Sequence, residues 1–185
     1  MRKDFGVKTW VYPQPVQIIG TYDEDGRPDI MNAAWGGMSN DEELFICLSA
    51  DHKTTKNLQK TKAFTVSFGT EETVVPCDYV GIVSANKVGD KVEKSGFTLR
   101  KADHVNAPLI EELPLCIECE LISYEESSCH LFGRIVNVSV DESILTDGRV
   151  DPDKFHAIVF DPCNHVYMGL GEVIARAFQA GAALK

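Results

Sequence analysis

The segment from His52 to Lys62 carries four lysines and no acidic residue, in a chain of 185 residues whose formal net charge is −10. It begins where the residues predict the start of a helix, and the free N–H groups and dipole of such an end attract phosphate. Thr54 and Thr55 could add hydroxyl donors there, and Lys53 or His52 a positive charge. The spacing alone leaves two interpretations open, a phosphate site and a solvent-exposed helix face, and it favours the second.

A second unusual segment, Asn32-Ala-Ala-Trp-Gly-Gly-Met38, surrounds one tryptophan with small residues. Glycines let a flat ligand approach the backbone closely, and Trp35 could pack on an aromatic ring. The alternative is a core tryptophan beside a β-bulge, which the pattern alone slightly favours. Neither segment identifies a catalytic residue, so none is assigned.

The composition limits the partners of the chain. With 28 acidic and 18 basic residues and a pI near 4.9, its surface repels nucleic acid and anionic membranes at long range. The chain is 44% apolar and 25% charged, and it has neither an apolar run of membrane-spanning length nor a recognisable export signal. We therefore expect an unprocessed cytoplasmic protein that binds neither nucleic acid nor membranes.

Motifs for metals, disulfides and nucleotide loops give no positive signal. The five histidines are dispersed, and no G-x-G-x-x-G or G-x-x-x-x-G-K-[ST] is present. Cys116 and Cys119 form a C-x-x-C, but their segment alternates like a strand, which puts residues three apart on opposite faces. We expect reduced thiols and no metal site.

These residues need a framework, and period-2 alternation predicts strands along the whole chain. A hairpin is expected from Val16–Tyr22 and Asp29–Trp35, joined by a turn at Asp23–Gly26. The other predicted strands are Leu44–Leu48, Ala63–Phe68, Leu115–Tyr124, His130–Val140, Ala157–Phe160 and Val166–Gly169.

Helical spacing is rarer. It predicts Lys53–Lys60 capped by Ser49 or Asp51, Thr73–Ser84, a helix start at Asp151-Pro152, and a short C-terminal helix over Gly171–Phe178. Strands from end to end with helices inserted between them indicate a mainly β protein, an antiparallel barrel or sandwich. No linker divides the chain, so we expect a single domain over residues 1–185.

The order and spacing of the motifs resemble one protein family nearly from end to end. The motifs are Tyr12-Pro-Gln-Pro-Val16, Gly20-Thr-Tyr-Asp23, Asn32-Ala-Ala-Trp-Gly-Gly37, His52-Lys-Thr54, Tyr79-Val-Gly-Ile-Val-Ser84, Lys94-Ser-Gly-Phe-Thr98, Asn106-Ala-Pro-Leu-Ile-Glu111, His130-Leu-Phe-Gly-Arg134 and Gly169-Leu-Gly-Glu172. The chain resembles the flavin reductase-like family with an FMN-binding split barrel, and within it the flavoredoxins. The resemblance implies a split β-barrel, an antiparallel Greek-key barrel with a few inserted helices.

The resemblance also implies a homodimer in which each barrel holds one FMN non-covalently near the dimer interface. It implies three sets of cofactor-binding residues. They are Asn32, Ala33, Ala34 and Trp35 beside the flavin, Ser49, Ala50, His52, Lys53, Thr54 and Asn57 around the phosphate, and Lys91, His130 and Phe160 near the ring.

For two of these residues, Lys91 and His130, a purely structural role is an alternative. A third, His52, differs from the residue that many relatives have at this position. Lys91, near the N1 and C2 carbonyl edge, would stabilise the anionic reduced flavin and raise its potential, or it is a solvated helix lysine. His130 could hydrogen-bond the flavin or substrate, or be an ordinary strand histidine. His52 stands where many relatives have arginine. A histidine is mostly neutral at pH 7, so we expect FMN affinity to rise below about pH 6.5.

The expected function follows from the cofactor, because FMN itself carries hydride and electrons. We expect an FMN-dependent oxidoreductase, a flavin reductase that takes electrons from NADH or NADPH. The alternative within the family is an electron carrier of the flavoredoxin type, which passes electrons between redox protein partners without a nicotinamide step. An alternative of another class is a non-enzymatic barrel that binds a different ligand in the same cleft.

Overall fold

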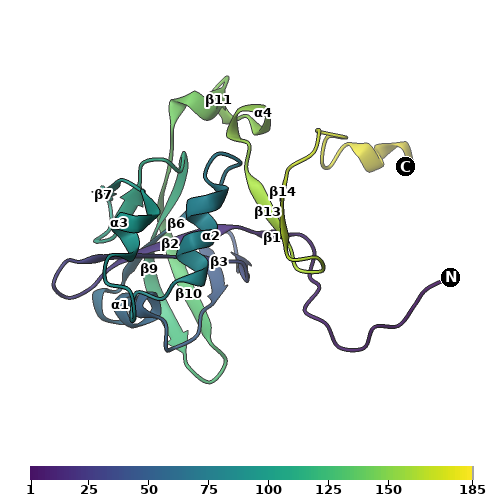
Figure 1. Ribbon diagram of the computed structural model, residues 1–185. Helices are drawn as coiled ribbons and strands as arrows, with labels where there is room; N and C mark the ends of the chain where they lie inside the picture. Colours follow the sequence, from purple (N-terminus) through teal and green to yellow (C-terminus); the bar gives the residue numbers. More distant parts are fainter. Residues whose placement is uncertain (185) are drawn as a thin grey trace.

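The computed structural model describes residues 1–184, and its centre is one seven-stranded sheet (Figure 1). The strands, in their order across the sheet, are β3 (Pro28–Ala33), β2 (Gln17–Tyr22), β6 (Ala63–Phe68), β9 (Leu115–Glu125), β10 (His130–Val140), β5 (Glu43–Cys47) and β4 (Gly36–Met38). All neighbouring strands in this sheet are antiparallel. The prediction of a mainly β, antiparallel chain is confirmed.

The connection between β3 and β4 explains why this sheet curls. The two strands lie at opposite edges of the sheet, yet only Ala34 and Trp35 separate them along the chain. Seven flat strands would be roughly 29 Å wide, whereas three Cα steps span about 11 Å at most. The sheet must therefore bend until its edges approach each other. The strand predicted over Asp29–Trp35 is wrong at its end, since it stops at Ala33 and leaves Trp35 at the seam.

The inside of the curl is the main hydrophobic core. Leu44, Ile46, Phe64 and Leu131 meet there and are at most 3% exposed. Burying each such side chain contributes about 1.5–3 kcal/mol. Gly133 of β10 has no side chain because the Phe64 ring occupies the space that its Cβ would need.

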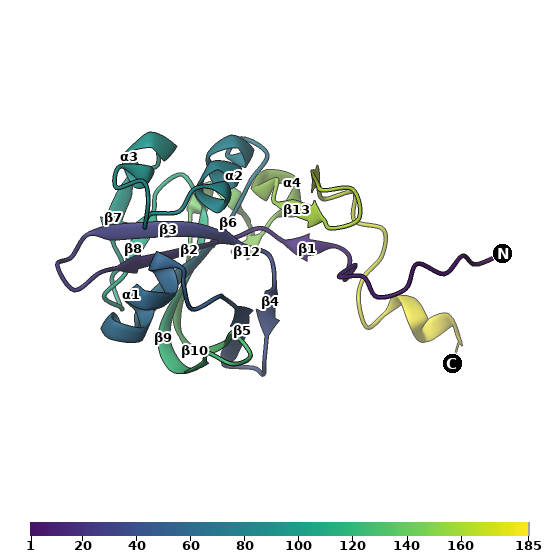
Figure 2. The same cartoon turned by 60° about the horizontal axis from the view of Figure 1, so that its bottom comes forward.

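Within residues 1–184 the helices are α1 (Lys53–Thr61), α2 (Val74–Ile82), α3 (Lys91–Ser95), α4 (Pro152–Phe155) and the 3₁₀ helices η1 (Glu142–Ile144) and η2 (Ala180–Leu184). Helices α1, α2 and α3 lie against this sheet, whereas the C-terminal 3₁₀ helix lies away from it (Figure 2). None of these helices is long and apolar enough to cross a membrane. The predicted α1 and α2 are confirmed, as is the start of α4, where the Asp151 carboxylate accepts the Asp153 N–H at 3.0 Å.

The predicted cap of α1 is wrong. His52, rather than Ser49 or Asp51, is the N-cap residue, and no side chain makes a capping hydrogen bond there. The helix begins at Lys53 as predicted, but Ser49 and Asp51 lie in the preceding turn, where the His52 N–H donates to the Ser49 carbonyl at 3.3 Å. The start of α1 therefore keeps its N–H groups available.

The two termini extend from the same side of the barrel (Figures 1 and 2). A small sheet beside the barrel consists of β1 (Gln14–Pro15), β13 (Ile158–Asp161) and β14 (Val166–Gly169). Two further pairs of short strands are β7 (Leu99–Lys101) with β8 (Pro108–Ile110) and β11 (Leu145–Thr146) with β12 (Arg149–Val150). The segments before β1 and after β14 run outward from this small sheet.

The predicted C-terminal helix over Gly171–Phe178 is wrong. Residues 171–176 have no regular secondary structure, and the 3₁₀ helix begins only at Ala180. Val173 and Ile174 are 71% and 97% exposed. Within residues 1–184 the segment therefore has no surface to pack on, and a short helix is not stable in water without such packing.

In β9 the side chains alternate between the two faces of the sheet as expected, but one of its acidic residues is buried. All six cysteines are free, and Cys116 and Cys119 lie in different hydrophobic clusters. Between them, Glu118 is only 1% exposed, because the loop that holds His104 covers it. Its carboxylate accepts the His104 backbone N–H at 2.7 Å and Asn137 Nδ2 at 2.9 Å.

Candidate functional site

A pocket of 110 Å³ lies where β3, the start of α1, the end of α2 and the start of α3 meet. Four of the predicted cofactor-binding residues line it, namely His52, Lys53, Thr54 and Lys91. Asp29 of β3 lies in the same wall. The structure thus gathers in one place residues from three separate parts of the sequence.

The start of α1 offers hydrogen-bonding groups that have nothing to bind. The first N–H groups of a helix have no partner within it, no side chain caps α1, and its first turn holds no acidic residue. His52 Nδ1 and Thr55 Oγ1 are also buried and unpaired within residues 1–184. Buried polar atoms are rarely left unpaired, so this end of α1 fits an anion such as a phosphate group.

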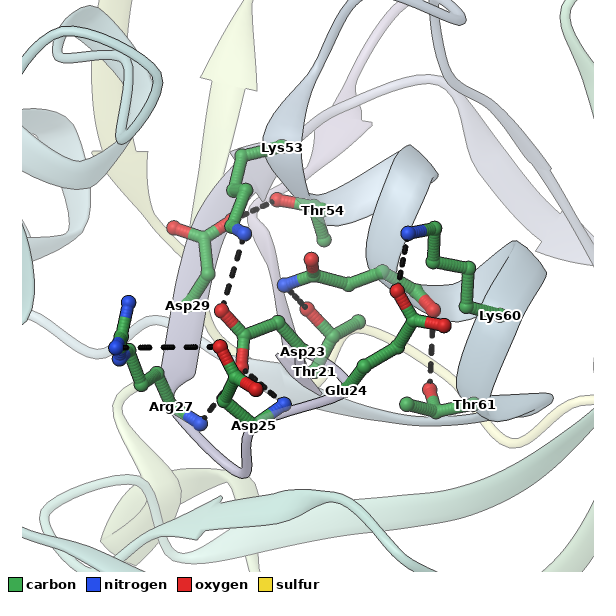
Figure 3. Close-up of polar contacts among 11 residues, drawn as sticks. Thr21, Asp23, Glu24, Asp25, Arg27, Asp29, Lys53, Thr54, Lys60 and Thr61 are labelled. Carbon is green, nitrogen blue, oxygen red and sulfur yellow. Dashed lines mark hydrogen bonds and ion pairs between the residues drawn. The ribbon is translucent and has the colours of Figure 1, made fainter.

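A buried ion pair forms another part of the wall. Lys91 Nζ lies 3.6 Å from Asp29 Oδ1, and the two side chains are 4% and 2% exposed. Thr54 Oγ1 donates to Asp29 Oδ2 at 2.5 Å (Figure 3). Desolvation lowers the pKa of Lys91, and the neighbouring Asp29 opposes part of that change. Lys91 is therefore not a solvated helix lysine.

Two of the three lysines of α1 are paired with the acidic turn between β2 and β3. Lys53 Nζ donates to Asp23 Oδ2 at 3.1 Å, and Lys60 pairs with Glu24 (Figure 3). The Lys60–Glu24 pair is exposed and adds little stability. The acid-free segment of the sequence is thus balanced in space by acids that precede it in the chain, and Lys53 is held at the rim between turn and pocket.

Three predicted phosphate residues do not line the pocket. Asn57 is 2% exposed and donates from Nδ2 to Thr21 Oγ1 at 3.1 Å, so its amide joins α1 to β2. Ser49 is exposed and Ala50 is half-buried in the turn before the helix. The pocket is formed by His52, Lys53 and Thr54 rather than by the whole predicted set.

Trp35 lies beside a separate apolar groove of 460 Å³. The groove is lined by Trp35, Gly36, Gly37 and Phe45 and, from the N-terminal segment, by Thr9, Val11 and Gln14. Trp35 is 50% exposed, so the alternative of a core tryptophan is wrong. The two alanines that precede Trp35 differ in burial: Ala33 is packed in the core, and Ala34 is half-buried at the seam.

His130 lies on the same face of the sheet as this groove. It stands opposite Cys47 in the β5–β10 register, and its ring packs edge-on against Phe45 with centroids 5.0 Å apart. Trp35 and His130 thus come together around Phe45.

Asn32 and Phe160 meet through Tyr167 of β14. Asn32 Nδ2 donates to the Cys77 carbonyl at 3.0 Å and to Tyr167 Oη at 3.5 Å. The Tyr167 hydroxyl in turn donates to Asp78 Oδ1 at 2.8 Å. The Phe160 ring lies with its centroid 5.9 Å from that of Tyr167.

The sequence patterns missed three polar residues of this region, Asp29, Asp78 and Tyr167. Each has its partner on an element far away in the chain, as Asp29 of β3 does with Lys91 of α3. The one local signal was an acidic residue at the start of a mostly apolar strand. That signal is too common at strand ends to indicate a site.

The family model for the flavin reductase like domain matches residues 9–156. The chain belongs to the flavin reductase like family. Flavoredoxin of Desulfovibrio vulgaris (Miyazaki F) is 38% identical, with a TM-score of 0.93 over 98% of this chain and 100% of that one. Flavoredoxin from Methanosarcina acetivorans is 23% identical, with a TM-score of 0.89 over 100% of both chains. An FMN-binding domain of a flavin reductases-like enzyme from Shewanella baltica OS155 is 15% identical, with a TM-score of 0.76 over 88% and 89%.

The curled sheet with its seam at Trp35 is the split barrel of the flavin reductase like family. The matched range contains the pocket at α1 and the whole apolar groove. Phe160 and Tyr167 lie beyond its end, on the β13–β14 hairpin.

Proposed function

We propose that this flavin reductase like protein binds FMN, with the phosphate at the start of α1 and the ring toward Trp35. The observation that carries the proposal is the set of unpaired hydrogen-bonding groups at the start of α1, beside the buried cation of Lys91. The likeness to flavoredoxin over the whole chain and the FMN-binding domain from Shewanella baltica support the choice of cofactor.

Each residue of the pocket has a distinct task in this proposal. The N–H groups of α1 and the ammonium of Lys53 would bind the phosphate, and Thr54 would hold the wall that carries Asp29. Lys91 adds a positive charge in a desolvated wall, where electrostatic effects are stronger than in water. When bound, FMN supplies hydride and electron transfer, so the chain needs no nucleophile or metal of its own.

We also propose that the protein is a homodimer, in which a second chain covers the exposed terminal segments. Many apolar residues of these segments are more than half exposed, among them Phe5, Val7, Val11, Val173, Ile174 and Phe178. Both segments leave the barrel on the same side (Figure 2). Exposed apolar surface of this kind marks interaction sites. Light scattering after gel filtration should give twice the 20.4 kDa of one chain, whereas a monomer would contradict the proposal.

For the activity we propose an NAD(P)H-dependent flavin reductase that works in the cytoplasm. The groove beside Trp35 is open and apolar and has the volume of a typical small-molecule site, which suits a nicotinamide ring of NADH or NADPH approaching a flavin. Six free thiols suit a reducing compartment. The second candidate is an electron carrier, favoured by the 38% identity to flavoredoxin and by a net charge that would attract a basic redox protein.

Anaerobic mixing of the FMN-loaded protein with NADH and, separately, NADPH distinguishes the two candidates. A reductase should lose its visible flavin absorbance promptly with at least one nucleotide, faster than free FMN does. A carrier should keep its absorbance with both nucleotides, lose it with dithionite, and recover it on mixing with an oxidised basic redox protein. A chain that takes up no FMN would contradict both and support the non-enzymatic barrel.

A further inference from the structure

Asn32 is held by hydrogen bonds that determine which way its side-chain amide faces. A carbonyl can only accept, so the amide atom 3.0 Å from Cys77 O is the nitrogen. Tyr167 Oη lies 3.5 Å from the same nitrogen. Gly81 of α2 makes this approach possible, because a Cβ there would stand 3.0 Å from Asn32 Cβ.

Tyr167 is itself oriented by Asp78. Its hydroxyl donates its single proton to Asp78 Oδ1 at 2.8 Å, so only its lone pairs face Asn32. Burial and the Asp78 carboxylate raise the pKa of Tyr167, so this hydroxyl stays protonated at neutral pH. The two amide hydrogens of Asn32 are therefore directed to Cys77 and Tyr167.

The remaining polar atom of the side chain, Asn32 Oδ1, is an acceptor that is still available. Within the described part of the chain only Nδ2 of this amide is hydrogen-bonded. Oδ1 has no partner there, and it is not among the buried polar atoms, so a ligand can reach it. Along the chain, Asn32 of β3 lies between Met31, which lines the pocket at α1, and Trp35 just beyond the strand, which lines the apolar groove. A ligand that occupies both places passes this segment.

We propose that Tyr167 and Asp78 are positioning residues that fix Asn32 as a hydrogen-bond acceptor toward the flavin and thereby favour its reduced form. This inference rests on the proposed binding of FMN. Two-electron reduction adds a proton at flavin N5, so the reduced ring has an N–H donor that the oxidised ring lacks. A fixed acceptor gains a partner only on reduction, whereas an amide free to turn would offer its NH₂ group to the oxidised ring equally well.

The test is the two-electron midpoint potential of FMN bound to the full-length protein. Asn32→Leu removes the acceptor at similar size and should reduce the preference for reduced over oxidised FMN about tenfold, which lowers the potential by about 30 mV. Tyr167→Phe frees one side of the amide and should give about a threefold reduction, or roughly 15 mV. Tyr124→Phe is the matched control, because its half-buried hydroxyl donates to the Leu48 carbonyl at 2.8 Å instead, and it should leave the potential unchanged.

The double variant Asn32→Leu/Tyr167→Phe separates positioning from general damage to the fold. If Tyr167 acts through Asn32, adding Tyr167→Phe to Asn32→Leu lowers the potential no further, because there is no amide left to turn. A fall of the same size in both backgrounds would overturn the proposal. An unchanged potential in Asn32→Leu would overturn it as well, even if Tyr167→Phe did not fold.

Failure of the proposed function is recognised before any potential is measured. Oxidised FMN is first titrated into the wild-type protein, and an absence of binding there would refute FMN as the cofactor. Binding with unchanged potentials in the variants would refute only the role of Asn32 and Tyr167. In the FMN-free protein, NMR of the Asn32 side-chain NH₂ group should show faster hydrogen exchange in Tyr167→Phe than in wild type, and equal exchange would contradict the positioning role.

Discussion

The two ends of the candidate site are built in opposite ways. The pocket at the start of α1 is formed within one chain, where the buried Asp29 carboxylate pairs with Lys91 and accepts a hydrogen bond from Thr54. The groove beside Trp35 is open, and half of the tryptophan is exposed. Binding a phosphate requires charges and donors already fixed in place, whereas apolar contact can be supplied by any surface, a second chain included. In the proposed function, the single chain would therefore suffice for phosphate recognition, whereas enclosure of the ring would need the second chain of the proposed dimer.

Lys91→Met should have the largest effect, because it disrupts the pocket at the start of α1. The change removes the buried cation and leaves Asp29 as an unpaired buried carboxylate. We expect FMN binding about 100-fold weaker and a free energy of unfolding about 3 kcal/mol lower, measured by calorimetric titration and by urea unfolding without FMN. Adding Asp29→Asn should restore much of the stability without restoring the affinity. FMN affinity unchanged in Lys91→Met would place this residue outside the site.

Trp35→Ala should have a smaller effect, at the open end. We expect about tenfold weaker FMN binding from the lost ring contact, with little change in the unfolding free energy, because Trp35 is half-exposed. Trp10→Ala in the N-terminal segment is the matched control, since Trp10 is 39% exposed and does not line the groove. If Trp35→Ala lowers the free energy of unfolding but leaves FMN affinity unchanged, Trp35 supports the fold and does not contact the flavin. That result would contradict the proposed difference between the pocket and the groove.

His52→Arg should strengthen phosphate binding in the pocket at α1 modestly. Arginine can bind a phosphate through two parallel hydrogen bonds, so we expect FMN affinity to rise about threefold to fivefold, with the gain shrinking at high salt. Riboflavin, which lacks the phosphate, is the control ligand and should bind the variant and the wild type equally. An equal gain for riboflavin would show that His52 does not lie at the phosphate.

Glu118→Gln lies outside both ends and should not change FMN affinity at all. Desolvation alone would raise the pKa of Glu118, but its hydrogen bonds from Asn137 and His104 outweigh this and lower it. A carboxylate with a lowered pKa stabilises the fold above its unfolded pKa, near 4.5, and loses this contribution as the pH falls through the folded value. Urea unfolding should show wild type about 1–2 kcal/mol more stable than Glu118→Gln at pH 7, with the difference vanishing in acid. A difference that persists in acid would contradict this role.

The sequence patterns could predict what is decided locally. The alternation in β6, β9 and β10 depends on near neighbours, and so does the start of a helix at Lys53. These segments appear in the structure within one or two residues of the expected bounds. His52, Lys53 and Thr54, which the sequence predicts to bind phosphate, line one pocket at the start of α1.

What the patterns could not predict depends on contacts between distant segments. Nothing near Asp29 in the sequence indicates that Lys91 reaches it, or that the acidic turn at Asp23 balances the lysines of α1. The segment Gly171–Phe178 has helical spacing, but within residues 1–184 it has no surface that would stabilise a helix. Trp35 is exposed because the two sheet edges meet there, which only the strand order reveals.

The central claim is that this chain recognises FMN through its phosphate at the start of α1. Its most direct test is to titrate the FMN-free protein with FMN and with riboflavin, which differ only in the phosphate, and to follow quenching of tryptophan fluorescence. We expect FMN to bind at least about 100-fold more tightly than riboflavin, and Thr54→Val to reduce that ratio about tenfold while riboflavin affinity stays the same. Equal affinities of the wild-type protein for the two ligands would contradict the claim.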